Sequence, residues 1–134
     1  PDEDFSNKNF PYLYGIDLSY NALSEFPKAP LTIDTLTIIS IRCQRDDDGN
    51  RTLSDSPTGI GKHPKLSALY IRSNDLGEIN DEISPYIMIF EIKDNPNISI
   101  DLSNVCDYIA MDYYLLIYDK TQDIRGCDAI ELVK

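Results

Sequence analysis

The sequence predicts an α/β solenoid, in which about five short parallel strands form a concave sheet and 3₁₀, irregular or short helical segments return on the convex side. Three observations predict this fold. One spacing of apolar residues followed by Asn occurs twice without a mismatch, weaker copies of it recur at regular intervals, and the segments between the copies are rich in proline. Short strands that turn at an Asn and return to begin the next strand build such a solenoid.

The two complete copies read L-x-x-L-x-L-x-x-N-x-L-x-x-L, with aliphatic or aromatic residues at the L positions. Their matching residues are Leu13, Ile16, Leu18, Asn21, Leu23 and Phe26, and then Leu66, Leu69, Ile71, Asn74, Leu76 and Ile79. Because side chains alternate across a strand, the apolar residues before each Asn share one face and the residues between them share the other. We therefore expect a short strand before each Asn, with the core on its apolar side.

Two further copies extend the array. They are Leu36, Ile39 and Ile41 with Gln44 in the Asn place, and Ile87, Phe90 and Ile92 with Asn95. The Asn-type positions 21, 44, 74 and 95 are 23, 30 and 21 residues apart, and a seven-residue insertion at residues 45–51 accounts for the longest interval. We expect Leu115 and Ile117 to mark a last strand, which turns at Lys120.

Proline restricts the segments between the strands. These prolines are Pro27, Pro30, Pro57, Pro64 and Pro85. Proline disrupts a helix interior, so long helices are not expected there. Each repeat is covered only by its neighbours, so the ends of the stack need caps. We predict a single domain over residues 1–134, part of a longer chain, with a capping region over residues 105–134.

The composition of the 134-residue chain limits its function. A net charge of −11 argues against a nucleic-acid partner, because proteins that bind phosphate backbones carry basic patches. No apolar run reaches the roughly 18 residues of a transmembrane segment. The sequence lacks the common catalytic and phosphate-binding motifs, and we expect its only histidine, His63, to be a solvated loop residue. We predict that the protein is not an enzyme and needs no cofactor.

The outward positions of the strands form three rows across the sheet. The spacing predicts that these rows are Gly15, Ile38, Ala68, Ile89 and Tyr114; Asp17, Ser40, Tyr70, Glu91 and Leu116; and Ser19, Arg42, Arg72, Lys93 and Tyr118. Three neighbouring cations in an acidic chain suit a protein ligand with an acidic patch. The candidate ligand-binding residues are Arg42, Arg72, Lys93, Tyr70, Ile38, Ile89, Tyr114 and Tyr118. Alternatively, the cations only keep an exposed sheet soluble.

The inserted loop, residues 45–51, has two interpretations. The oxygen atoms of Asp46, Asp48 and Asn50 are weak candidates for a calcium site. However, Asp55 stands where an EF-hand loop has its bidentate Glu, and flanking helices are not expected. The other interpretation is a polar turn, which the Asp-Gly pair favours.

Two of the three cysteines flank the expected last strand. Cys106 and Cys127 are 21 residues apart, and a disulfide between them would pin the open end of the stack. Such a bond suits an exported protein. It requires Cα atoms within about 7 Å of each other, so the spacing allows both a bridge and two free thiols. We expect Cys43 to be a free, partly buried thiol.

The repeats resemble the short leucine-rich repeats of bacterial extracellular and surface proteins, including the internalin-like group. The ending Tyr118-Asp-Lys-Thr-Gln-Asp-Ile-Arg-Gly-Cys127 resembles the terminal segment of bacterial surface leucine-rich repeat lipoproteins. This resemblance implies a non-catalytic module that binds a protein ligand on its concave face, outside the cell or at the cell surface. The alternatives are a structural spacer in a larger surface protein and a glycan-binding module of a nutrient-capture system, with sugars stacked on Tyr20, Tyr70, Tyr114 and Tyr118.

Overall fold

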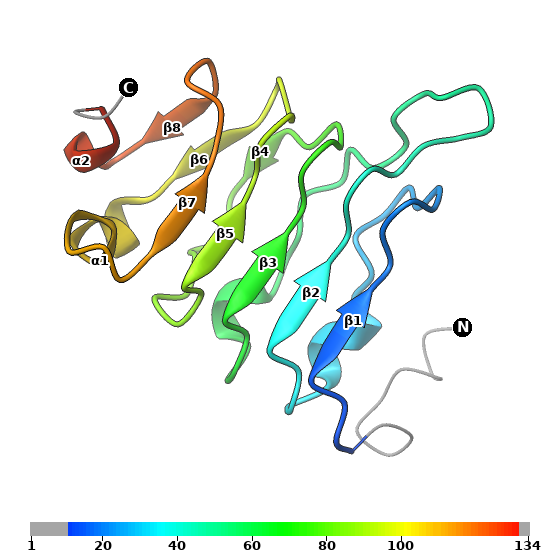
Figure 1. The fold of residues 1–134 in the computed structure, drawn as a ribbon, viewed down its shortest axis with the longest axis horizontal. Coiled ribbons are helices and arrows are strands. Elements are labelled where there is room, and N and C mark those ends of the chain that lie inside the picture. The colour runs from blue at the N-terminus through cyan, green and yellow to red at the C-terminus, as the bar shows by residue number, and fades with distance from the viewer. Residues whose placement is uncertain (1–10, 132–134) are drawn as a thin grey trace.

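The computed structural model describes residues 11–131 and contains one sheet of five parallel strands (Figure 1). In spatial order, which is also chain order, they are β1 (Gly15–Asp17), β2 (Ile38–Ser40), β3 (Ala68–Tyr70), β5 (Ile89–Glu91) and β7 (Leu115–Ile117). The expected set of strands is therefore confirmed. Their first residues stand opposite one another in the ladder, in the order Gly15, Ile38, Ala68, Ile89 and Leu115.

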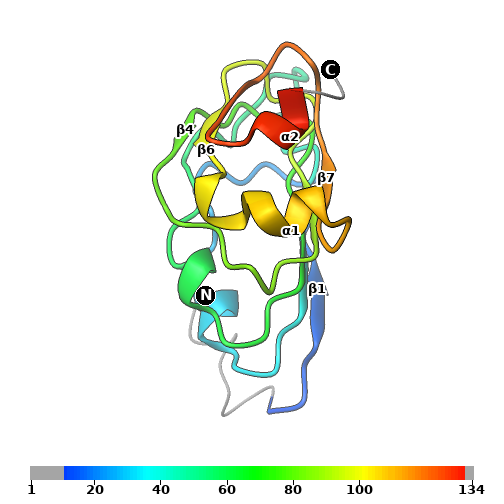
Figure 2. The same ribbon diagram turned by 90° about the vertical axis from the view of Figure 1, so that its left-hand side faces the viewer.

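The returning segments of the later repeats form a second parallel sheet, which the repeat pattern does not predict. It contains β4 (Glu78–Ile79), β6 (Ser99–Asp101) and β8 (Asp123–Arg125), in that order. Ile79, Ile100 and Ile124 stand opposite one another and are all buried. Figure 2 shows the two sheets on opposite sides of the solenoid. The repeated isoleucine thus gives these extended returns an apolar side that faces the core.

The earlier returns contain short 3₁₀ helices, as expected. These are η2 (Ala29–Thr32) and η3 (Ile60–Lys62). A proline lies in the first turn of η2, where its missing N–H group leaves no hydrogen bond unmade. In η3, a Cβ atom on Gly61 would lie 2.0 Å from the carbonyl oxygen of Glu82 in the next return. Successive returns are therefore in direct backbone contact at this point.

The apolar positions of the repeats build a continuous core between the two sides. Those that are buried include Leu36, Ile39, Ile41, Leu66, Leu69, Ile71, Ile87, Phe90 and Ile92. Leu13, Ile16 and Leu18 of the first repeat are only partly buried. Burial of apolar surface is the main force that holds such a stack together, at roughly 25 cal/mol per Å².

The Asn-type residues tie each repeat to the one before it. The Nδ2 group of Asn74 donates to the carbonyl oxygens of Ile41 (2.7 Å) and Ile71 (3.0 Å), one in each repeat. Asn95 likewise donates to the carbonyl oxygens of Ile71 and Ile92. The residue before each Asn-type position has a left-handed backbone with φ between 54° and 61°, and these residues are Tyr20, Cys43, Ser73 and Asp94.

Lys120 lies in the turn of the last repeat, as expected, because the N–H group of Gln122 donates to the carbonyl oxygen of Asp119 across it (3.1 Å). The hydrogen bonds of the Asn-type position come from Gln122 instead. Lys120 is exposed, whereas Gln122 is buried. The Nε2 group of Gln122 donates to the carbonyl oxygens of Ile92 (2.8 Å) and Asn95 (3.2 Å). Because its side chain is longer than that of Asn, Gln122 reaches the preceding repeat from a more distant backbone position.

His63 is buried rather than solvated, which corrects the expectation from the sequence. Its Nδ1 atom accepts hydrogen bonds from the N–H groups of Lys65 (3.1 Å) and Leu66 (3.0 Å). An imidazole that accepts at Nδ1 carries its hydrogen on Nε2, which lies 2.8 Å from the carbonyl oxygen of Ile33. His63 therefore links two successive returns and serves the fold.

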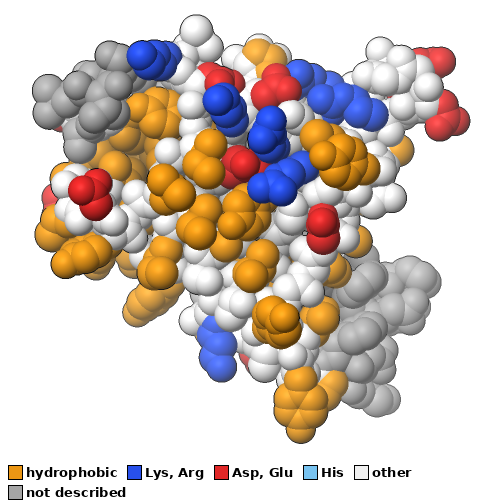
Figure 3. Space-filling view, in the orientation of Figure 1, with side chains coloured by type: hydrophobic (Ala, Val, Ile, Leu, Met, Phe, Trp, Pro, Cys, Tyr) orange, Lys and Arg blue, Asp and Glu red, His pale blue; other side chains and the backbone are white. Residues whose placement is uncertain are grey.

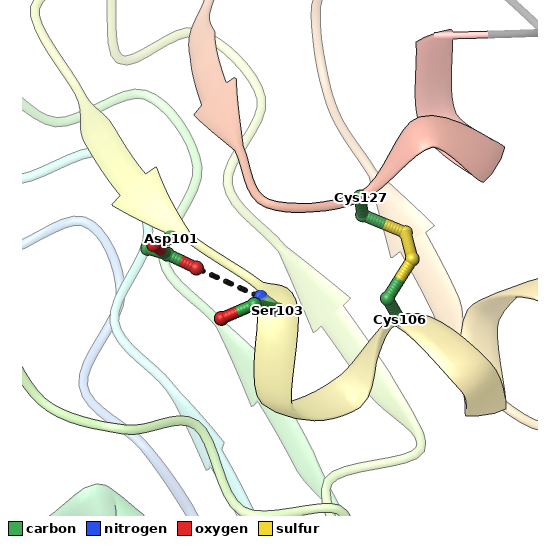
Figure 4. The surroundings of a disulfide bond; sticks show 4 residues. All are labelled: Asp101, Ser103, Cys106 and Cys127. Carbon is green, nitrogen blue, oxygen red and sulfur yellow. Dashed lines mark hydrogen bonds between the residues drawn. A yellow bond between two sulfur atoms is a disulfide. The ribbon is translucent and has the colours of Figure 1, made fainter.

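The carboxyl end of the stack carries η4 (Ser103–Val105), α1 (Cys106–Ala110) and α2 (Asp128–Glu131). The structure joins Cys106 and Cys127 by a disulfide, with Cα atoms 5.1 Å apart (Figure 4). Nearby, Oδ1 of Asp101 accepts a hydrogen bond of 2.8 Å from the N–H group of Ser103. The bonds from Ser103 lower the pKa of Asp101. The disulfide connects α1 to the segment that leads into α2 and so holds this end of the chain together.

Candidate ligand-binding face

The outward face of the five-stranded sheet carries two contrasting rows of side chains. The first is an apolar row, formed by Ile38, Ala68, Ile89 and Leu115 at the first residues of their strands. Ile38 is 38% exposed and Leu115 is 56% exposed. The second is a basic row just beyond the carboxyl ends of the strands, formed by Arg42, Arg72 and Lys93. Figure 3 shows hydrophobic side chains over the amino-terminal part of the sheet and Lys and Arg side chains over its carboxyl-terminal edge.

Glu91 organises the basic row. Its carboxylate is almost fully buried; Oε1 accepts a hydrogen bond of 2.6 Å from Nε of Arg42, and Oε2 lies 4.0 Å from Nη1 of Arg72. The guanidinium of Arg42 also lies over the ring of Tyr70, with Cζ 4.5 Å from the ring centroid. The hydrogen bond to Glu91 raises the pKa of Arg42. Arg42 is thus held flat across the sheet in a fixed position.

The other two cations of the basic row are open to solvent. The side chain of Arg72 is 47% exposed, and its contact with Glu91 is long. Within residues 11–131, the side chains of Arg72 and Lys93 make no hydrogen bond. Arg42 and Arg72 lie beside the carboxylate of Glu91, and Lys93 is exposed next to them in the same row. Cations therefore outnumber this carboxylate, although the chain carries a net charge of −11.

A shallow hollow of about 470 Å³ opens on the same face, over β1, β2 and β3. It is lined by Gly15, Ile16, Asp17, Ile38, Ser40, Arg42 and Tyr70. The hollow exists because Gly15 has no side chain beside Ile38 of the neighbouring strand. Hydrogen bonds from Ser19 lower the pKa of Asp17, so its carboxylate is ionised at neutral pH. The hollow therefore combines apolar walls with an anion and a cation at its rim.

The register of β7 corrects two of the predicted site residues. Leu115, not Tyr114, stands opposite Ile89, and Ile117 stands opposite Glu91. Tyr114 is only 4% exposed, and burial raises its pKa. Tyr118 is half-buried and packs against the core. Every residue from 113 to 118 is apolar or aromatic, so alternation alone does not show which side of this strand faces inward.

The inserted segment forms a hairpin that is pinned beside the basic row. Arg45 and Arg51 pair across its base as an antiparallel bridge. Arg51 donates to the carbonyl oxygens of Asn74 (2.6 Å) and Asp94 (2.7 Å), and to Oδ1 of Asp94 (2.8 Å). Arg45 donates to the carbonyl oxygen of Ser73. These two arginines are therefore structural, and the hydrogen bond from Arg51 lowers the pKa of Asp94.

The predicted calcium ligands lie at the tip of this hairpin, where they form the turn. The carboxylate of Asp46 accepts hydrogen bonds from the N–H groups of Asp48 (2.9 Å) and Asn50 (2.8 Å). The Nδ2 group of Asn50 donates to the same carboxylate. In the described part of the chain, no three His, Cys, Asp or Glu side chains are grouped so that they could hold a metal ion. The geometry of Asp46, Asp48 and Asn50 is that of a polar turn.

The parallel ladder, the apolar core positions and the linked Asn-type residues define a leucine-rich repeat solenoid. Over 97% of its length the chain is similar to a leucine-rich repeat protein from Bacteroides thetaiotaomicron VPI-5482, with 50% identity, a TM-score of 0.93 and coverage of 15% of that chain. A leucine-rich repeat protein from Bacteroides eggerthii DSM 20697 is 56% identical over 97% of this chain and 21% of its own, also with a TM-score of 0.93. The chain thus spans about a fifth or less of the length of these two proteins.

No protein-family model matches the chain, and no curated protein matches it. Each helix among the described residues is too short or too polar to cross a bilayer.

Proposed function

We propose that the chain is a non-catalytic binding module that holds a protein ligand on the concave face of its five-stranded sheet, at the surface of a bacterial cell. The observation that supports this function is the apolar row, with Ile38 and Leu115 exposed, beside a basic row in a chain of net charge −11. Arginine and large apolar side chains are typical of interface centres. A positively charged region on a negatively charged protein favours an acidic partner and raises the rate at which that partner associates.

The rings of His63 and Tyr114 are buried and so are not part of the exposed face of the sheet. The ring nitrogens of His63 are both engaged with backbone groups of the returns. The hydroxyl of Tyr114 is buried and makes no hydrogen bond with the described residues.

The positions of the tyrosines disfavour the glycan-binding alternative. Arg42 covers the ring of Tyr70, Tyr114 is buried, and Tyr118 packs against the core. Tyr20 is 80% exposed but lies in the turn after β1. Stacking on a sugar ring needs an open aromatic face, and these four side chains do not form a continuous platform on the sheet.

One observation supports a place outside the cytosol. The Cys106–Cys127 disulfide is of a kind that persists in oxidising compartments.

The face can be tested by capture of a ligand and comparison of variants. The immobilised 134-residue chain is incubated with bacterial surface proteins and host extracellular proteins, and the retained proteins are identified by mass spectrometry. Binding of each retained protein is then measured by calorimetry with the double variant R72E/K93E. We expect this charge reversal to weaken binding by about thirty-fold or more, as loss of hot-spot contacts does.

The matched control is K28E/K62E, which makes the same charge change on the returns, where Lys28 precedes η2 and Lys62 ends η3. It should bind as the wild type does. A ligand that binds all three proteins equally would contradict the proposed use of the face and would support the structural-spacer alternative.

A further inference from the structure

We infer that the hollow beside Gly15 is the anchoring pocket of this face, and that it receives one large apolar side chain of an extended peptide segment whose acidic residues lie over Arg72 and Lys93. This inference rests on the proposed function and names the class of ligand. It follows from the position of the hollow, from the charges around it and from the distance between them.

The hollow is a shallow, open depression with room for a large side chain. Its volume is about 470 Å³, and its walls include the exposed side of Ile38 and Tyr70. A Cβ atom on Gly15 would lie 3.8 Å from Cβ of Ile38, which is an ordinary van der Waals contact, so the space above Gly15 is open. Filling such a space with an apolar side chain removes apolar surface of both partners from water.

The cations lie on one side of the hollow. Arg42 lines the hollow, Arg72 follows one strand further along the sheet and Lys93 two strands further. Neighbouring strands are about 4.8 Å apart, so the path from the hollow to Lys93 is roughly 12 Å. An extended segment advances about 3.3 Å per residue and covers this path in about four residues.

The charges determine which residues suit that path. Arg72 and Lys93 make no side-chain hydrogen bond within residues 11–131, and the Nη groups of Arg42 are likewise unbonded there. Carboxylates of a ligand can therefore pair with them. Asp17, which is ionised, lies on the other side of the hollow and repels acidic residues there. The complementary segment thus carries its acidic residues on only one side of its apolar anchor.

The negative charge of the rest of the molecule also favours binding of an acidic segment at the basic row. The net charge of −11 repels an acidic segment from most of the surface, so the basic row is the attractive region. Neutral apolar peptides lack the charge-assisted bonds, and acidic peptides without an apolar side chain leave the hollow unfilled. Both features are needed for tight binding.

The test uses a display library of random linear peptides, panned on the full 134-residue chain. We expect enrichment of an aliphatic or aromatic residue within about four positions of two or more acidic residues. The enriched peptide is then synthesised, and its affinity is measured for wild type, G15F, G77F and R72E/K93E. G15F places a large side chain in the hollow: the backbone of Gly15 is not left-handed, and the added Cβ atom meets only ordinary van der Waals contacts.

G15F should weaken binding by about thirty-fold while its melting temperature stays at or above that of wild type. G77F is the matched control, because a Cβ atom there meets nothing within 4 Å and Gly77 lies in the return after β3. It should bind normally.

The outcomes separate the inference from the proposed function. If R72E/K93E loses the peptide and G15F keeps it, the hollow is not the anchor, although the basic row still serves binding. If the wild type enriches no such motif, the inference is overturned. The proposed function is then still tested by the capture experiment. Equal binding by all four proteins would contradict both.

Discussion

The Nε–H group of Arg42 donates to Oε1 of Glu91 over a distance of 2.6 Å, although the two residues are 49 positions apart in the chain. The guanidinium crosses above the ring of Tyr70 on the strand between them. One buried carboxylate therefore sets the position of a cation that lines the hollow, and it partly neutralises the row that a ligand would meet.

Replacement of Glu91 by Ala should lower the free energy of unfolding by about 2 kcal/mol, because it removes a charge-assisted hydrogen bond and leaves a gap in the face. Urea unfolding of the purified variant measures this change. E78A removes a carboxylate from an exposed position in β4 and should change stability by no more than about 0.5 kcal/mol. Equal effects of the two substitutions would contradict a structural role for Glu91.

G61A should destabilise the protein by about 3 kcal/mol, because the added Cβ atom would lie 2.0 Å from the carbonyl oxygen of Glu82 and both returns would have to shift. Thermal and urea unfolding report the loss. The control is G77A, where the same methyl group meets no atom within 4 Å. If G61A is as stable as G77A, the two returns do not pack as closely as described.

The acid sensitivity of the fold should depend on Arg51. Hydrogen bonds from Arg51 and Ser73 lower the pKa of Asp94 below that of the unfolded chain. The ionised pair therefore stabilises the fold at neutral pH, and this contribution is lost as the pH falls through the pKa of Asp94 in the folded state.

The free energy of unfolding of wild type and R51M is measured at a series of pH values. The difference between the two proteins should become smaller as the pH is lowered from about 5 to about 3. Some difference should remain in acid, since Arg51 also donates to two backbone carbonyls. K120M removes an exposed cation and should show no such narrowing. If the difference in free energy of unfolding between wild type and R51M stays constant over this pH range, Asp94 does not mediate the stabilisation by Arg51.

Reduction of the Cys106–Cys127 disulfide should lower stability by about 3 kcal/mol, as expected for a closed loop of this length. Melting curves with and without dithiothreitol measure the loss. The C106S/C127S variant should have the melting temperature of the reduced protein, and dithiothreitol should not change it. The melting temperature of C43S should still fall when dithiothreitol is added. Titration of three free thiols in the unreduced, unfolded protein would contradict the bond.

The repeat spacing predicts most of the fold for a physical reason. Leu66, Leu69 and Ile71 must all point inward to bury their side chains, and Asn74 must turn there to reach the preceding repeat. These local requirements determine the strand positions and the ladder. The second sheet depends instead on how successive returns happen to lie beside one another, which local spacing does not specify.

The candidate site is only partly predictable for the same reason. The rows containing Arg42, Arg72 and Lys93 follow from the alternation of side chains. The ion pair of Arg42 with Glu91 depends on the register of strands that are distant in the chain. Alternation assigns Tyr114 to the wrong side because residues 113–118 are apolar or aromatic on both sides. It does not reveal the hollow, which arises from the missing side chain of Gly15.

The hairpin at residues 45–51 is a suitable site for a label that reports ligand binding to the five-stranded sheet. It stands away from the solenoid (Figure 1), and Arg45 and Arg51 pair across its base. Asp47, in the turn of the hairpin, is exposed. A fluorophore attached at Asp47 would leave Arg45 and Arg51 in place and report from the same side as the carboxyl ends of the strands. Ligand occupancy could then be followed optically in a protein whose recognition residues are all intact.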